Sequence, residues 1–120
     1  MRVLVTGAYG MLGREVVAAS RGPGHDTEAR DVDPPDIPGA DALAQARADL
    51  DPDVVVNCAA WTDVDGAEEH ERAALRLNGE APGILARATA AAGVRIVHVS
   101  TDYVFPGDAR EPYVESSLTG

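Results

Sequence analysis

Short apolar runs alternate with stretches of helical periodicity along most of the chain. The runs at residues 3–5, 54–60 and 95–100 are rich in valine and are each short enough for one strand. Between them, residues 11–20 and 82–92 place apolar side chains every three or four positions, as amphipathic helices do. This alternation predicts an α/β fold around a parallel sheet, in which the second and third runs are buried strands.

Less regular segments complete the expected order. Residues 25–30 are polar but stand where a second parallel strand belongs, and residues 41–50 carry the pattern of a short helix. A further helix is expected over residues 66–77, interrupted at Asn78-Gly79 before the next helical stretch begins. Residues 106–120 are rich in glycine, proline and acidic side chains, so we expect mostly loop within a single domain of residues 1–120.

Three glycines follow the first predicted strand and open the first predicted helix. We expect Gly7 to permit a tight turn, Gly10 to let a diphosphate approach the main chain, and Gly13 to let the helix pack closely. The amides of Gly10, Met11 and Leu12 would then point outward at the positive end of a helix. The spacing is GxxGxxG rather than GxGxxG, but its strand–helix context favours dinucleotide binding over an ordinary glycine turn. The predicted fold class is a Rossmann-like, doubly wound parallel sheet.

The end of the second predicted strand carries Arg30 and Asp31. A carboxylate about 20 residues beyond the glycines accepts hydrogen bonds from the adenosine ribose in many dinucleotide sites. Arg30 instead favours a 2′-phosphate, so the choice between NAD and NADP stays open at this point.

The composition of the chain limits the classes of partner that it is expected to bind. The formal net charge of −10 argues against nucleic acid or an anionic membrane, although main-chain amides can still bind phosphate in an acidic protein. No apolar run approaches membrane length, and the N-terminus enters a strand without a signal-peptide pattern, so we expect a cytoplasmic protein. The single cysteine, Cys58, is expected to be a small apolar filler, and the three dispersed histidines predict no metal site.

Three segments in this order resemble the extended short-chain dehydrogenase/reductases, and most closely their dTDP-4-dehydrorhamnose reductase branch. They are residues 6–13 (TGAYGMLG), 52–65 (PDVVVNCAAWTDVD) and 99–105 (VSTDYVF). The resemblance implies reduction of a dTDP-4-keto-6-deoxyhexose with NADH or NADPH, in which hydride passes from the nicotinamide to C4 of the sugar.

The resemblance also implies roles for individual residues. Thr101 matches a catalytic hydroxyl that orients the keto oxygen, and Val64, Asp102 and Tyr103 match positions near the substrate. Further positions match residues that line the cofactor: Asp36, Ile37, Ala59, Ala60, Trp61, Thr62, Asn78 and Val99. Trp61 suits a core anchor as well as it suits a wall of the nicotinamide site.

One departure from the family is large. Its catalytic Tyr-x-x-x-Lys pair is absent, because all ten basic residues are arginines and Ser117 stands four residues after Tyr113. A tyrosine hydroxyl with a pKa near 10 needs a positive neighbour to serve as the proton donor at neutral pH. We therefore expect the chain to represent the N-terminal portion of such a reductase and to be inactive alone.

Two alternatives remain open at this stage. Relatives of this fold also serve as regulatory modules that bind a dinucleotide without catalysis, and other members are epimerases or dehydratases, which the STDYVF segment disfavours. We also expect an apolar sheet edge beside residues 94–99, through which the chain self-associates.

Overall fold

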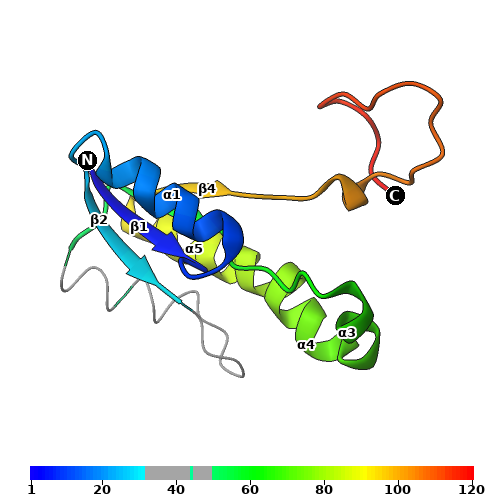
Figure 1. Ribbon diagram of the computed structural model, residues 1–120, viewed down its shortest axis with the longest axis horizontal. Helices are drawn as coiled ribbons and strands as arrows, with labels where there is room; N and C mark the ends of the chain where they lie inside the picture. Colours follow the sequence, from blue (N-terminus) through cyan, green and yellow to red (C-terminus); the bar gives the residue numbers. More distant parts are fainter. Residues whose placement is uncertain (32–43, 45–49) are drawn as a thin grey trace.

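The computed structural model describes residues 1–31, 44 and 50–120. Its centre is a four-stranded sheet of β1 (Arg2–Thr6), β2 (Asp26–Arg30), β3 (Val54–Asn57) and β4 (Arg95–His98). The strand order is β2-β1-β3-β4 and all three pairings are parallel, which confirms the predicted sheet (Figure 1). The chain crosses from one side of β1 to the other after β2, so the β1–β3 pair forms a topological switch point.

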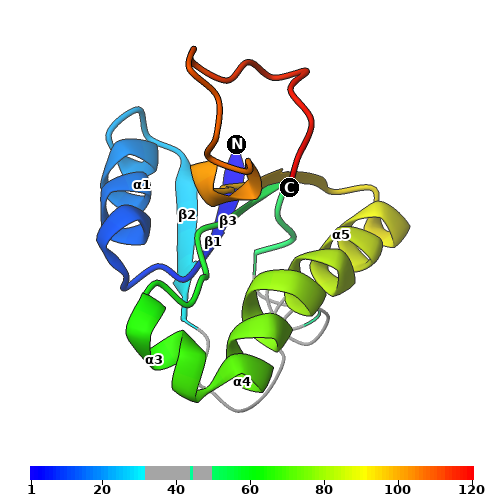
Figure 2. The same cartoon turned by 90° about the vertical axis from the view of Figure 1, so that its right-hand side faces the viewer.

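Helices cover both faces of this sheet. α1 (Met11–Arg21) lies on one face and α5 (Ala81–Ala92) on the other, as Figure 2 shows. α1 begins at the glycine turn, while α5 ends at Gly93, which adopts the left-handed conformation with φ of 68°. The Rossmann-like arrangement predicted from the alternating pattern is therefore present.

The two faces form separate apolar clusters because successive strand residues point in opposite directions. Leu4 and Val55 are fully buried against Leu85 of α5. Val3 and Val5 pack with Val17 of α1 on the opposite face. The register places Val3 beside Val54 and Leu4 beside Val55, so each cluster continues from β1 into β3.

The helical region before α5 differs from the prediction. The expected helix at 66–77 is two short helices, α3 (Val64–Glu69) and α4 (Glu71–Leu75), which are separated at His70. The interruption expected at Asn78-Gly79 is wrong, because those residues lie in a π-helical turn (Arg76–Glu80) that runs directly into α5. A π-helical turn holds one more residue than an α-helical turn and is frequent at functional sites.

Two strand predictions also need correction. The apolar run at 54–60 continues beyond β3, which ends at Asn57. The strand predicted as buried at 95–100 is largely exposed, with Val97 at 52% and Val99 at 41% exposure. β4 forms one edge of the described sheet, so only one of its sides is paired.

Residues beyond β4 contain only one short regular element, the 3₁₀ turn η2 (Asp102–Val104). The rest is loop, as predicted, and Figure 1 shows it extending away from the sheet. The loop closes on itself, because the Gly120 amide donates to the Val104 carbonyl at 2.9 Å. Phe105 and Tyr113 stack inside it with centroids 4.5 Å apart.

The predicted helix at 41–50 falls, apart from residues 44 and 50, outside the described residues, as do Asp36 and Ile37. Within the described part of the chain, no helix has the length and apolar character needed to cross a bilayer.

Candidate dinucleotide site at the carboxyl edge of the sheet

The glycine turn joins β1 to α1, and two of its glycines are required by the fold itself. Gly7 has φ of 66°, and a Cβ there would lie 2.5 Å from the Ala59 nitrogen. A Cβ on Gly13 would lie 2.0 Å from the Gly7 carbonyl oxygen. Gly10 is different, because a Cβ there would meet only Gly7 O at 3.4 Å, an ordinary van der Waals contact.

The N-terminus of α1 is open to a ligand. Gly10 is its N-cap, with φ of −69°, and makes no side-chain cap. The Gly10 amide donates to the Gly7 carbonyl at 3.2 Å, so it does not point outward as predicted. The amides of the first helical turn, from Met11 onward, have no carbonyl four residues earlier within the helix. Met11 and Leu12 are 89% and 46% exposed, so no packed side chains bury this edge.

The turn lies at the end of β1, between the ends of the two strands that flank it, β2 and β3. The Ala8 amide donates to the Arg30 carbonyl at the end of β2, at 3.1 Å. On the other side, the Cys58 amide donates to the Thr6 carbonyl at 3.0 Å. Open α/β sheets bind ligands in the crevice at this position.

The end of β2 brings Arg30 and Asp31 to the same edge. The Arg30 guanidinium forms an ion pair with Glu28 on its own strand. Asp31 is exposed directly after β2, next to the residue whose carbonyl holds the glycine turn. Both residues are therefore close to the turn, as a ribose-binding role requires.

A row of polar side chains crosses the sheet at its carboxyl edge, and the sequence analysis did not identify it. Thr6 Oγ1 donates to Asn57 Oδ1 at 2.7 Å, and both residues are buried. The same oxygen accepts the Ala59 amide at 3.2 Å, so the Asn57 Nδ2 must be the atom 3.0 Å from His98 Nδ1. Each of these residues is the last of its strand, and their alignment on adjacent parallel strands brings them together.

The loop after β3 leads to Trp61, which several neighbours hold. Asn78 Oδ1 accepts the Trp61 amide at 2.8 Å, and Asn78 Nδ2 donates to the Trp61 carbonyl at 3.1 Å. The indole Nε1 donates to the Asp63 carbonyl at 2.8 Å, and the ring lies 5.9 Å from the His70 ring. Trp61 is partly exposed, so it is not a core anchor.

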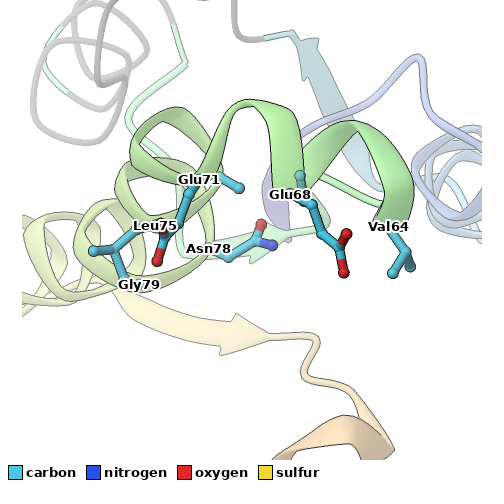
Figure 3. A pocket seen from close by; sticks show the side chains of 8 residues that line it. Val64, Glu68, Glu71, Leu75, Asn78 and Gly79 are labelled. Carbon is cyan, nitrogen blue, oxygen red and sulfur yellow. The ribbon is translucent and has the colours of Figure 1, made fainter.

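A shallow hollow of about 730 Å³ lies beside Asn78, between α3 and the π-helical turn (Figure 3). Its wall includes Val64, which is 58% exposed, and Leu75, which is 61% exposed. Glu68 and Glu71 also line it, so the hollow carries negative charge near an apolar surface. Val64 and Asn78, predicted for the substrate and the cofactor, therefore share one cavity.

The other predicted residues lie along the chain that leads out of these strands. Ala59 is partly buried beneath Gly7, while Ala60 and Thr62 are exposed. Thr101 is the N-cap of η2, where its Oγ1 accepts a hydrogen bond from the Tyr103 amide at 3.2 Å and donates one to Asp102 Oδ1 at 3.3 Å.

Val99, Thr101, Asp102 and Tyr103 are all exposed, Tyr103 at 79%. Figure 1 shows η2 displaced from the sheet along the extension of β4. These side chains follow β4 at the same edge as the glycine turn but are not packed against it.

Cys58 is partly buried rather than buried, and it follows β3 rather than lying within it. Burial raises the pKa of its thiol, so the thiolate is disfavoured. A role as a nucleophile is therefore unsupported. Among the described residues, no group of three or more His, Cys, Asp or Glu side chains is arranged to hold a metal ion.

Comparison with known proteins identifies relatives of the whole chain. A 4-ketoreductase of Streptomyces antibioticus, named as probably acting on dTDP-4,6-dihydroxy-2-methyloxan-3-one, is 49% identical over 99% of this chain and 41% of its own length. A crystal structure of a dTDP-4-dehydrorhamnose reductase from Clostridium acetobutylicum superposes with a TM-score of 0.87 and 40% identity. It is matched over 100% of this chain and 43% of that one.

A dTDP-4-dehydrorhamnose reductase from Bacillus anthracis, solved in complex with NADP, has a TM-score of 0.85 and 33% identity. The match covers 98% of this chain and 42% of that one, so the chain spans about two fifths of the length of these relatives. The profile of the family described as the RmlD substrate binding domain matches residues 1–120. The chain therefore belongs to the RmlD substrate binding domain family.

Proposed function

We propose that this chain binds the diphosphate of NADH or NADPH at the N-terminus of α1. The observation that supports this most directly is the difference among the three glycines. The fold itself requires Gly7 and Gly13, but Gly10 has room for a methyl group and an ordinary φ. A glycine that the protein does not need for its own packing fits a position at which a ligand approaches the backbone.

The proposed activity is NAD(P)H-dependent reduction of a dTDP-4-keto-6-deoxyhexose, such as dTDP-4-dehydrorhamnose, with this chain as the cofactor-binding part. The names of its relatives support the sugar class, and the NADP complex of the Bacillus anthracis relative supports the cofactor class. The bound cofactor supplies a hydride to the sugar carbonyl.

The residues of the chain serve this reaction by binding and orientation. The amides of Met11 and Leu12 hold the diphosphate, and Asp31 accepts hydrogen bonds from the adenosine ribose. The Thr101 hydroxyl donates to the keto oxygen and orients it, which requires that its bond to Asp102 be exchanged for the substrate.

The chain has no lysine, and we propose that these 120 residues alone do not turn over the sugar nucleotide. Losing a positioned proton donor removes roughly two to four orders of magnitude in rate. A coupled assay in which the isolated chain oxidises NAD(P)H with the keto-sugar would overturn this part of the proposal.

Titration with NADH and NADPH tests the proposed cofactor site. Trp61 is the sole tryptophan, so its emission, which overlaps the absorption of reduced nicotinamide, reports binding from one place. We expect saturable quenching in the wild-type chain and none in Gly10→Ala. We also expect the two chains to have the same thermal melt, which would show that the variant is folded. Equal binding by the folded variant, or a flat wild-type titration, contradicts the assignment.

A further inference from the structure

We propose that Asn78 is a positioning residue that acts on the cofactor through the main chain of Trp61, which its side chain holds in place. The inference rests on the proposed function, because it assigns a role within that site. Its basis is the pair of hydrogen bonds between the Asn78 amide and the two backbone groups of one residue.

These two bonds fix the position of the Trp61 backbone relative to the planar side-chain amide of Asn78. The Trp61 N–H and C=O both face the one side-chain amide of Asn78, and a side chain that bonds to both holds the main chain of that residue against translation and rotation. The contact spans 17 residues of sequence and joins the π-helical turn to the loop after β3. It uses one hydrogen of Asn78 Nδ2 and one lone pair of Asn78 Oδ1.

The other end of the same loop is held independently. The Ala59 amide donates to Asn57 Oδ1 at 3.2 Å, and Ala59 lies directly beneath Gly7. Residues 59–61 are therefore fixed by one asparagine at each end. We call the two hydrogen bonds from Asn78 to Trp61 the Asn78 clamp. Loss of this clamp frees the end of the loop at Trp61 and Thr62, while the end at the glycine turn keeps its support.

The π-helical turn explains how Asn78 reaches this loop. Its extra residue shifts the side-chain direction between α4 and α5, and Figure 3 shows the Asn78 amide directed away from the helix axis.

The clamp divides the ligand into two halves with different expected responses. The diphosphate lies at the glycine turn, whereas the part of the loop that Asn78 holds faces the proposed nicotinamide ribose. We therefore expect Asn78→Ala to weaken binding of NADPH or NADH by about tenfold or more, since two hydrogen bonds are lost. Binding of ADP, which has the diphosphate but no nicotinamide ribose, is expected to stay within about twofold.

The experiment measures the affinity of the 120-residue chain for NADPH, NADH and ADP in wild type, Asn78→Ala and Asn78→Asp. ADP is measured by calorimetry and the reduced cofactors by Trp61 emission. Acrylamide quenching of Trp61 without ligand follows the clamp itself, and we expect faster quenching in both variants. Asn78→Asp keeps an acceptor for the Trp61 amide and places a carboxylate against the Trp61 carbonyl, so it tests the donor separately.

Thr89→Ala is the matched control for lost stability. Thr89 is buried in α5, where its hydroxyl donates to the Ala86 carbonyl at 3.0 Å, far from the proposed site in sequence and fold. We expect this variant to melt at a lower temperature with unchanged ligand affinities and unchanged Trp61 quenching. A merely structural role for Asn78 would give the same result as this control.

The outcomes separate the two proposals. A wild-type chain that binds neither reduced cofactor overturns the proposed function and this inference together. If the wild-type chain binds NADPH and both Asn78 variants bind it with the wild-type affinity, only the role of Asn78 is overturned. A parallel loss of NADPH and ADP affinity also overturns it, because the clamp then does not act on one half of the ligand.

Discussion

A Cβ atom on Gly13 would lie 2.0 Å from the carbonyl oxygen of Gly7. The first turn of α1 is therefore in direct contact with the glycine turn that follows β1, and no side chain fits between them. Gly13→Ala is expected to separate strand and helix and to cost about 1–3 kcal/mol or more, as overpacking does. We expect the melting temperature to fall by about 5–15 °C in thermal circular dichroism.

Gly22→Ala is the matched control for this substitution. Gly22 also borders α1 and has a helical φ of −54°, and its nearest heavy atom would be 3.6 Å from an added Cβ. We expect its melt to be unchanged or slightly raised, because alanine reduces the entropy of the unfolded chain. A Gly13→Ala variant as stable as Gly22→Ala would show that the turn and helix can move apart freely.

The layered fold was predictable because it depends on patterns that are local in sequence. Val3 to Val5 and the valines of β3 are apolar on both faces, as strands buried between helices require. β4 has two β-branched apolar residues at its centre, Ile96 and Val97, but Val97 is exposed because β4 lies at the edge of the described sheet. Composition alone does not distinguish an edge strand from a central one.

The site was predictable only where backbone geometry determines residue type. The glycines at 7 and 13 reflect close contacts that no other residue permits, so their spacing carries the signal. The clamp between Asn78 and Trp61 depends on a π-helical turn, and the sequence pattern instead suggested a break at that asparagine. Main-chain hydrogen bonds from distant side chains leave no periodic pattern in a sequence.

Acid should lower the stability of the fold at the amino end of the sheet, where the Asp53 carboxylate accepts hydrogen bonds from Arg2 of β1. The Asp53 carboxylate accepts from the Arg2 amide at 2.7 Å and from its guanidinium at 2.8 Å. These bonds from Arg2 lower the pKa of Asp53 to about 2. A lowered carboxyl pKa stabilises the fold above the unfolded value, near 3.9, and that contribution is lost as the pH falls toward 2.

Asp53→Asn tests this pH dependence. We expect wild-type stability in urea to drop as the pH falls from about 4 to 2, and the variant to lose less over the same interval. The variant should also be less stable than wild type at neutral pH, because the Arg2 guanidinium loses one of its two charged partners and keeps only Asp51. Identical pH profiles would mean that other carboxylates account for the acid sensitivity.

Cys58 is expected to react slowly in the folded chain. Burial raises the pKa of its thiol, so the reactive thiolate is less abundant than in an unfolded chain at the same pH. At pH 8, alkylation by iodoacetamide, followed by mass spectrometry, should be slower in buffer than in urea. Equal rates in the two conditions would show that the loop after β3 opens readily.

Self-association through β4 is the remaining prediction, and it follows from the exposed edge. β4 pairs only with β3 in the described sheet, and Val97 on it is 52% exposed. An edge strand with unpaired backbone groups and apolar side chains is a template for pairing with a second strand. The net charge of −10 opposes contact between two copies, so we expect association to increase with salt.

Sedimentation at several protein and salt concentrations measures this association. Val97→Glu places a charge at the edge and should give monomers throughout, whereas Val97→Thr, which keeps a β-branched side chain, should retain most of the association. The two variants differ mainly in charge, so a difference between them assigns the contact to β4. Monomeric wild type at high salt and roughly 100 μM protein, well above the micromolar range of modest interfaces, would rule out pairing through this edge.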